Sequence, residues 1–155
     1  MTYAEALAQL QALEASLPTL ACQGHCTECC GPLGMSQLEF VRVRRATPLR
    51  LAESQTPTCP LLKRGRCTVY AVRPLICRLW GIVETMPCPW GCRPARFLTM
   101  EEGDVLMREV AQLSQTLFPD APARTMHTSE MIEQVQERGA KAVAWAILAS
   151  MEPVR

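Results

Sequence analysis

A stretch near the amino terminus, ACQGHCTECCGPLG at residues 21–34, constrains the folding of this chain more than any other feature. It places four cysteines within nine positions, and Cys29 and Cys30 are adjacent. Adjacent Cα atoms lie about 3.8 Å apart, whereas a disulfide normally needs roughly 4.4 to 6.8 Å, so these two thiols require other partners. Short spacers of this kind let several thiolates converge on one metal site from a single turn.

The complete set of nine cysteines lies between residues 22 and 92 of the 155-residue chain. Because the number is odd, at least one cysteine cannot belong to an intramolecular disulfide. The first residues, MTYAEALAQLQALEASL, lack the features of a secretory signal, so we expect a cytoplasmic protein with reduced thiols. Clustered thiols in that setting indicate metal ligands or redox groups. The candidate metal ligands are Cys22, Cys26, Cys29, Cys30, Cys59, Cys67, Cys77, Cys88 and Cys92.

Basic side chains accumulate in the same part of the chain. Residues 22–98 contain 11 Lys or Arg and 4 acidic residues, a net charge of +7, whereas the whole chain carries +1. A thiolate site stays anionic after it binds a divalent cation, and neighbouring guanidinium groups would lower both the thiol pKa and the cost of burying that charge. The alternatives are a solvated basic face or a nucleic-acid surface. The arginines concerned are Arg42, Arg44, Arg45, Arg66, Arg73, Arg78, Arg93 and Arg96.

Apolar side chains recur at helical spacing in several segments outside the cysteine cluster. Two helix starts are marked by capping boxes, in which a Ser or Thr precedes a Glu by three positions: Ser36 with Glu39, and Thr99 with Glu102. Prolines follow the ends of the corresponding periodic segments and stop them. The sequence therefore predicts helices at residues 2–17, 36–48, 99–117 and 129–150.

The middle of the chain contrasts with these segments. Residues 49–98 show no lasting period, and their prolines repeatedly interrupt regular structure. We therefore expect a mainly α fold, a small helical domain with an irregular, cysteine-rich centre that a metal organises in place of apolar burial. No repeat or linker divides the chain, so we expect a single domain over residues 1–155. Within it, residues 22–98 form the metal-binding region and residues 99–155 a C-terminal helical pair. The longest apolar stretch, AVAWAILASM, is too short to span a bilayer, so no membrane contact is expected.

The order of the cysteines carries a specific resemblance. C-x3-C-x2-C-C is followed by C-P-L-L and then by C-x-V-Y-x-x-R-P-x-x-C-R. This order, over about residues 22–98, resembles the YkgJ-type cysteine-cluster family, which is described as a zinc- or iron-chelating domain. The resemblance places Cys88 and Cys92 less securely than the other cysteines. The ligands that it implies are Cys22, Cys26, Cys29, Cys30, Cys59, Cys67 and Cys77, with Tyr70, Arg73, Pro74 and Arg78 as companion residues.

The expected cofactor is zinc or iron, an iron–sulfur cluster included, because thiolates bind all of these and their softness excludes magnesium and calcium. His25 lies within the cluster and is an additional candidate ligand. Trp80 and Trp90 are expected to shield the site or to belong to the core.

The role of the metal stays open between different classes of protein. The first hypothesis is that the chain is a cysteine-cluster metal-binding protein, with the metal ion as its partner. The alternatives are a zinc-ribbon-like module that binds nucleic acid or protein, and a redox or iron–sulfur component of a modifying enzyme. Cys22-x3-Cys26-x2-Cys29 resembles the triad of radical S-adenosylmethionine enzymes, but the repeated strand–helix units of their barrel are missing. No set of Cys, His and acid for nucleophilic catalysis is recognisable, so no catalytic residue is assigned.

Overall fold

The computed structural model describes residues 1–24, 27, 30–31, 34–48, 58–122 and 124–125. Helices account for 46% of the described residues and strands for 9%, so the expected mainly α fold is confirmed. In chain order, the elements are α1 (Tyr3–Ala15), β1 (Gly34–Met35), α2 (Gln37–Ala46), β2 (Leu62–Lys63), β3 (Arg66–Cys67), the 3₁₀ turn η1 (Tyr70–Val72), α3 (Leu75–Leu79), α4 (Met100–Leu117) and β4 (Arg124–Thr125).

Three of the helices begin in the same way. The hydroxyl of the N-cap residue accepts a hydrogen bond from the third helical N–H, and the glutamate at that third position accepts one from the N-cap N–H. The helices predicted at residues 2–17, 36–48 and 99–117 are confirmed as α1, α2 and α4, with ends at most two residues inside the predicted bounds. The helix predicted at residues 129–150 lies outside the described residues. The three capping boxes are Thr2 with Glu5, Ser36 with Glu39 and Thr99 with Glu102.

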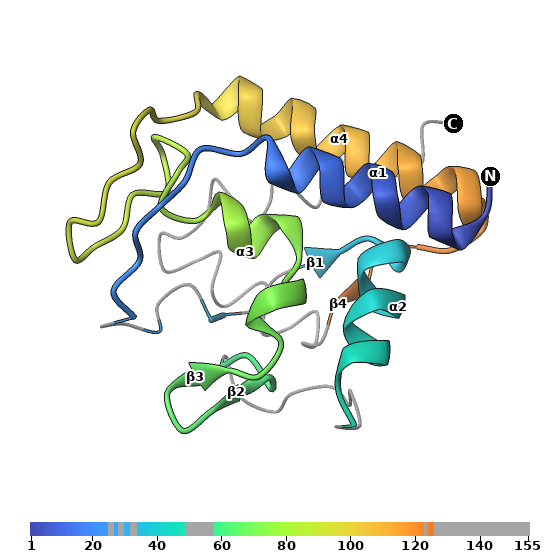
Figure 1. Cartoon of the computed structure of the whole chain (residues 1–155), viewed down its shortest axis with the longest axis horizontal. Helices are drawn as coiled ribbons and strands as arrows, with labels where there is room; N and C mark the ends of the chain where they lie inside the picture. Colours follow the sequence, from blue (N-terminus) through green and yellow to red (C-terminus); the bar gives the residue numbers. More distant parts are fainter. Residues whose placement is uncertain (25–26, 28–29, 32–33, 49–57, 123, 126–155) are drawn as a thin grey trace.

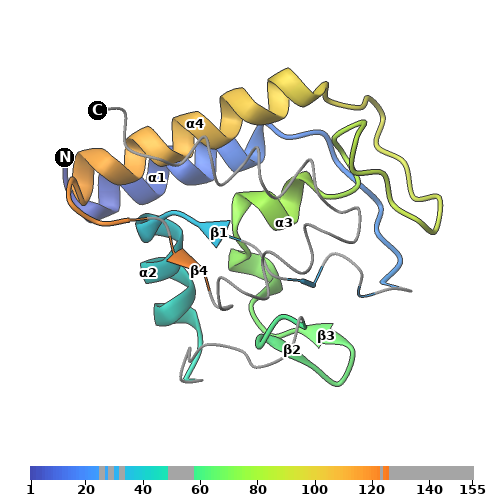
Figure 2. The same ribbon diagram turned by 180° about the vertical axis from the view of Figure 1, so that it is seen from behind.

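The two longest helices, α1 and α4, lie side by side along one edge of the molecule (Figure 1, and Figure 2 from behind). Helix α3 lies beneath them, and the antiparallel β2–β3 hairpin lies on the far side from α1 and α4. Strand β1 pairs with β4, also antiparallel. Among the described residues, no helix is both long and apolar enough to cross a membrane.

The centre that was expected to be irregular, residues 49–98, is described over residues 58–98, and the regular elements there are short. This part contains the β2–β3 hairpin, η1 and α3. The hairpin closes through Arg64 and Gly65, whose φ angles of 51° and 74° are both positive, as a two-residue turn of type I′ requires. Strands of two residues and a helix of five are too short to leave a period in the sequence.

The larger hydrophobic core joins α1, α3 and α4 to the loop between α3 and α4. Residues 49–98 were expected to depend on a metal in place of apolar burial, but their described part contributes many of the side chains of this core. The expectation therefore underestimated the apolar packing of this region. Whether a metal adds to the stability of the region stays a prediction. The buried core residues of this region are Leu75, Ile76, Leu79, Ile82, Val83, Met86 and Leu98. A smaller core cluster consists of Met35, Val43, Leu61 and Val69.

Candidate metal centre

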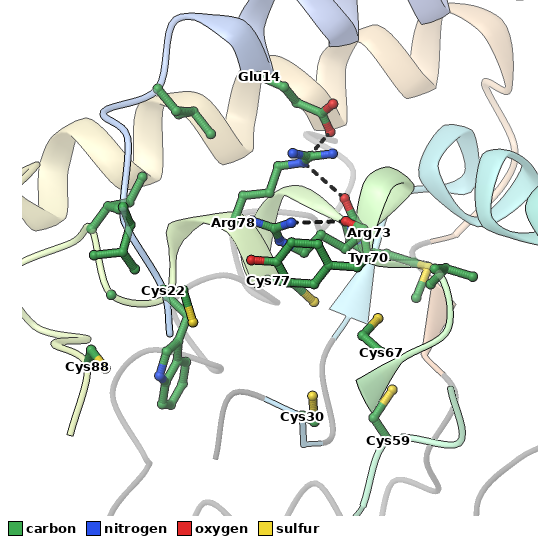
Figure 3. A pocket seen from close by; sticks show the side chains of 18 of the residues that line it. Glu14, Cys22, Cys30, Cys59, Cys67, Tyr70, Arg73, Cys77, Arg78 and Cys88 are labelled. Atoms are coloured by element: carbon green, nitrogen blue, oxygen red, sulfur yellow. Dashed lines mark hydrogen bonds and ion pairs between the residues drawn. The ribbon is translucent and has the colours of Figure 1, made fainter. Parts of the chain in front are cut away.

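Six of the nine candidate cysteines line one cavity of about 420 Å³ (Figure 3). The cavity lies between the carboxyl-terminal end of α1, helix α3 and the β2–β3 hairpin. Cys92 is among the described residues but does not line the cavity. Cys26 and Cys29 lie outside the described residues, as does His25. The six lining cysteines are Cys22, Cys30, Cys59, Cys67, Cys77 and Cys88.

Backbone hydrogen bonds bring three of these cysteines to one side of the cavity. The Cys59 N–H donates to the Cys30 carbonyl at 3.0 Å, and the Leu62 N–H donates to the Cys59 carbonyl at 3.0 Å. Cys67 lies directly opposite Leu62 in the β2–β3 pair. Cys59 and Cys67 also pack against the smaller core cluster. Backbone pairing and apolar contacts thereby hold Cys30, which is distant in sequence, beside Cys59 and Cys67.

Cys22 and Cys88 lie on the other side of the cavity in the view of Figure 3, and Cys77 of α3 lies between the two groups. Gly81 allows the chain to approach itself closely at this side. Its φ is +88°, and a Cβ at this position would lie 2.5 Å from Leu20 Cδ2 and 3.8 Å from the Cys88 Cβ. A side chain here would therefore be strained by its backbone conformation and would displace the Leu20 side chain.

The seven described cysteines are thiols rather than disulfides. Within the described part of the chain, no three His, Cys, Asp or Glu side chains lie close enough together to hold one metal ion. These thiols therefore surround the cavity without forming a complete coordination sphere. The segment that carries Cys26 and Cys29 starts at Cys22 and ends at Cys30, both of which line the cavity.

A buried ion cluster centred on Glu14 lies beside the thiols. Arg42 donates two hydrogen bonds to the Glu14 carboxylate, from Nη1 to Oε2 at 3.0 Å and from Nη2 to Oε1 at 2.6 Å. The Arg78 Nε lies 3.0 Å from the same Oε1. The side chains of Arg42, Glu14 and Arg78 are only 6%, 8% and 18% exposed. We call Glu14, Arg42, Arg78 and the neighbouring Arg73 the Glu14 cluster.

The guanidinium groups of this cluster also hold the backbone that leads into α3. The Arg73 carbonyl accepts hydrogen bonds from Arg42 Nη2 at 3.1 Å and from Arg78 Nε at 3.2 Å. Arg78 Nη2 donates to the Ala71 carbonyl at 2.7 Å. The Arg73 guanidinium donates to the Tyr70 carbonyl at 3.0 Å and lies 3.8 Å from the centroid of the Tyr70 ring. The turn that precedes Cys77 is therefore fixed by side chains from α2 and α3.

The Glu14 cluster carries an excess of positive charge, because it contains three guanidinium groups and one carboxylate, and only Arg42 and Arg78 are paired with that carboxylate among the described residues. Burial is the largest cause of a lowered pKa of Arg78; Glu14 opposes this shift, and the charges of Arg73 and Arg42 add to it. With the arginines charged and the carboxylate ionised, the cluster has a net charge of +2. An anionic group in the adjacent cavity would be stabilised by this charge.

The arginines predicted near the thiols do not all lie at the cavity. Arg73 and Arg78 line the cavity, and Arg42 contacts them through the Glu14 cluster. Arg96 instead forms an exposed ion pair with Glu102 at 2.9 Å. Arginines therefore lie beside the thiols at the cavity around α3, whereas Arg96 does not line it.

Two acidic residues near the site were not predicted to have these roles. Glu14 is not among the predicted site residues; its position in the helix predicted at residues 2–17, four residues after the apolar Leu10, was the available signal. Glu39 is fully buried, and its Oε1 accepts a hydrogen bond from the Leu75 N–H at 2.6 Å. Burial raises the pKa of the Glu39 carboxyl, against the hydrogen bonds that it accepts. Glu39 thereby joins the start of α2 to the start of α3, the helix that contains Cys77.

The chemistry of the cavity fits a thiolate-bound metal. The Nε1 of Trp80, a residue that lines the cavity, is buried and has no hydrogen-bond partner among the described residues. A buried indole N–H without an acceptor is costly, and a metal-bound thiolate would provide one. Thiol donors select zinc, iron or an iron–sulfur cluster over magnesium and calcium. The positive charge of the Glu14 cluster suits the net negative charge of such a centre.

Comparison with known proteins agrees with this chemistry. Residues 21–97 match the family CxxCxxCC, described as a putative zinc- or iron-chelating domain. No curated protein and no solved structure gives a match to the chain. The matched residues include all nine cysteines, together with Arg73 and Arg78, but not Glu14. The resemblance seen in the cysteine order is thus confirmed, and over residues 21–97 the chain belongs to the CxxCxxCC family of metal-chelating domains.

Proposed function

We propose that this protein binds zinc or iron, an iron–sulfur cluster included, through cysteine thiolates at the cavity in a reducing cytoplasm. The observation that carries the proposal is the convergence of six cysteines from separate segments around one cavity with arginines in its wall. The ligands come from these six and from Cys26 and Cys29, which belong to the same ordered set.

Charge supports the same proposal. Four thiolates around a divalent cation carry a net charge of −2, which equals in size the +2 of the Glu14 cluster. Within the described residues, the charges of Arg42 and Arg78 are directed to Glu14 and to backbone carbonyls rather than to an exposed basic surface. This arrangement favours an internal anionic centre over a nucleic-acid surface as the use of these side chains.

The test combines metal analysis with matched cysteine variants. We expect protein purified without oxygen to contain about one equivalent or more of zinc or iron, and less than about a tenth of an equivalent of both would refute the proposal. Visible absorption distinguishes an iron–sulfur cluster from zinc, because zinc proteins are colourless.

The variants separate the cavity cysteines from a cysteine elsewhere. Cys59→Ser and Cys67→Ser should each lower the metal content, because both thiols line the cavity. Cys92→Ser is the matched control, since Cys92 does not line the cavity, and it should retain the metal content of the wild type. Equal losses in all three variants would show that the cavity does not define the ligand set.

A further inference from the structure

Glu14 of α1 lines the cavity of the candidate metal centre, although α1 precedes the residues that match the family. Glu14 lines the same cavity as the six cysteines, whereas the match begins at residue 21. In Figure 3 its carboxylate faces the guanidinium of Arg78, and α1 forms that side of the site. The side chain is 8% exposed, so its charge must be balanced inside the protein.

We propose that Glu14 is a positioning residue of the metal centre, which fixes the Arg78 guanidinium in the cavity wall and with it the short helix that carries Cys77. This inference rests on the proposed function, because it assigns Glu14 a role in retaining the metal. It also extends the centre to a helix outside the matched residues.

The need for such a residue follows from the size of α3. This helix has five residues, Leu75–Leu79, and an isolated helix of that length is not stable in water. The Arg78 side chain of this helix donates to the Arg73 and Ala71 carbonyls, which precede the helix. These hydrogen bonds require the guanidinium to stay in one orientation, and the contact of its Nε with Glu14 Oε1 favours that orientation.

The same carboxylate allows two guanidinium groups to lie close together. Arg42 and Arg78 both donate to the Arg73 carbonyl and both contact Glu14 Oε1. Without the carboxylate, like charges would face each other in a buried site and would separate or draw in water. Loss of Glu14 would therefore release Arg78 from the cavity wall.

The direction of the effect distinguishes positioning from a direct electrostatic action. A carboxylate repels an anionic thiolate centre, so removing its charge would strengthen metal retention if charge were its only contribution. If Glu14 positions Arg78, removing its charge weakens retention. Glu14→Gln keeps the size of the side chain and removes the charge, so the two effects have opposite signs in one variant.

The first measurement is the rate at which the metal-loaded protein transfers its metal to a chromogenic chelator. We expect Glu14→Gln to release metal about tenfold faster than the wild type, the lower range for loss of a residue that orients a metal site. Leu13→Ala, on the same turn of α1, removes a half-buried apolar side chain and controls for lost stability of the helix. Glu109→Gln removes an exposed charge from α4 and should release metal at the wild-type rate.

The second measurement is amide hydrogen exchange in the metal-free protein. Glu14→Gln should speed exchange in residues 71–79 more than Leu13→Ala does, while exchange in α4 stays comparable in both variants. Arg78→Lys, which keeps the charge but loses the forked donors, should give the same pattern. It replaces Glu14→Gln in both measurements if that variant does not fold.

The outcomes separate this inference from the proposed function. Wild-type protein without metal would refute the proposed function, and hydrogen exchange would still decide whether Glu14 positions α3. If the wild type holds metal, release from Glu14→Gln that is slower than in the wild type would overturn the inference. Metal release and hydrogen exchange in Glu14→Gln that are no faster than in Leu13→Ala would also overturn the inference. In both cases the proposal that the protein binds metal would still hold.

Discussion

Replacing the buried glutamate of α2 by glutamine tests how α3 is attached to the rest of the fold. Three helices begin with the same capping box, but Glu39 alone among the three glutamates is fully buried. Its Oε2 accepts from the Ser36 N–H at 2.8 Å and from the Ser36 hydroxyl at 2.9 Å. Its Oε1 accepts from the Leu75 N–H at 2.6 Å. Both oxygens are therefore occupied by donors of the protein.

The size of the effect follows from this geometry. In Glu39→Gln one oxygen becomes an NH₂ group, so either the Leu75 N–H or the Ser36 N–H faces another donor. Leaving one buried donor without an acceptor costs about 1 to 3 kcal/mol. Removing the carboxylate offsets part of this loss, because burial disfavours the charged form and raises its pKa. We expect the free energy of unfolding to fall by about 2 kcal/mol.

The assay is chemical denaturation of the metal-free, reduced protein at neutral pH, followed by far-ultraviolet circular dichroism. Glu102→Gln is the matched control, because Glu102 completes the same capping box at an exposed position on α4. It should lose clearly less stability than Glu39→Gln. Equal losses in the two variants, or a Glu39→Gln protein more stable than the wild type, would refute the argument that Glu39 holds the start of α3.

Three further predictions concern packing, backbone strain and pH. Leu79→Ala should lower the free energy of unfolding by about 3 kcal/mol with or without metal, because Leu79 is 1% exposed; an unchanged denaturation midpoint would contradict the core assignment. Gly81→Ala should lower the melting temperature more than Gly91→Ala does. Both glycines have a positive φ, but of the two only Gly81 would bring the new Cβ against Leu20. Equal shifts of the melting temperature would count against a close approach at Gly81. Burial raises the pKa of the Glu39 carboxyl, so the folded protein binds a proton at Glu39 more tightly than the unfolded chain does. The stability that this proton adds is fully present below pH 4.5 and is lost as the pH rises through the raised pKa. The stability difference between the wild type and Glu39→Gln should therefore grow as the pH is lowered toward 4.5, and a difference that shrinks would show the opposite shift.

The helices α1, α2 and α4 could be predicted because their signals are local. A hydroxyl residue three positions before a glutamate predicted the starts of α2 and α4, and apolar spacing predicted the buried faces. The capping box of α1, Thr2 with Glu5, has the same pattern but was not recognised in the sequence. Helix α3 follows Pro74 and has five residues, and its first N–H is satisfied by Glu39 of another helix. A tertiary hydrogen bond of this kind leaves no pattern in the neighbouring sequence.

The candidate site shows the same division. The order of the cysteines predicted a metal centre and its family, because ligand spacing is a local property. Which thiols share a cavity depends on tertiary contacts, such as the hydrogen bond from the Cys59 N–H to the Cys30 carbonyl. The role of Glu14 also depends on contacts with Arg42 and Arg78, which come from two other helices. A charged residue on an otherwise apolar helical face was a signal, but it did not identify the partner.

The central claim is that cysteine sulfurs hold zinc or iron at this cavity. X-ray absorption at the metal edge of protein purified without oxygen tests it most directly, because the first shell reports the ligand atoms themselves. The account predicts a shell dominated by sulfur, at about 2.3 Å for a zinc–thiolate site. A first shell made only of nitrogen and oxygen at about 2.0 to 2.2 Å would contradict it, even if the protein contained a full equivalent of metal.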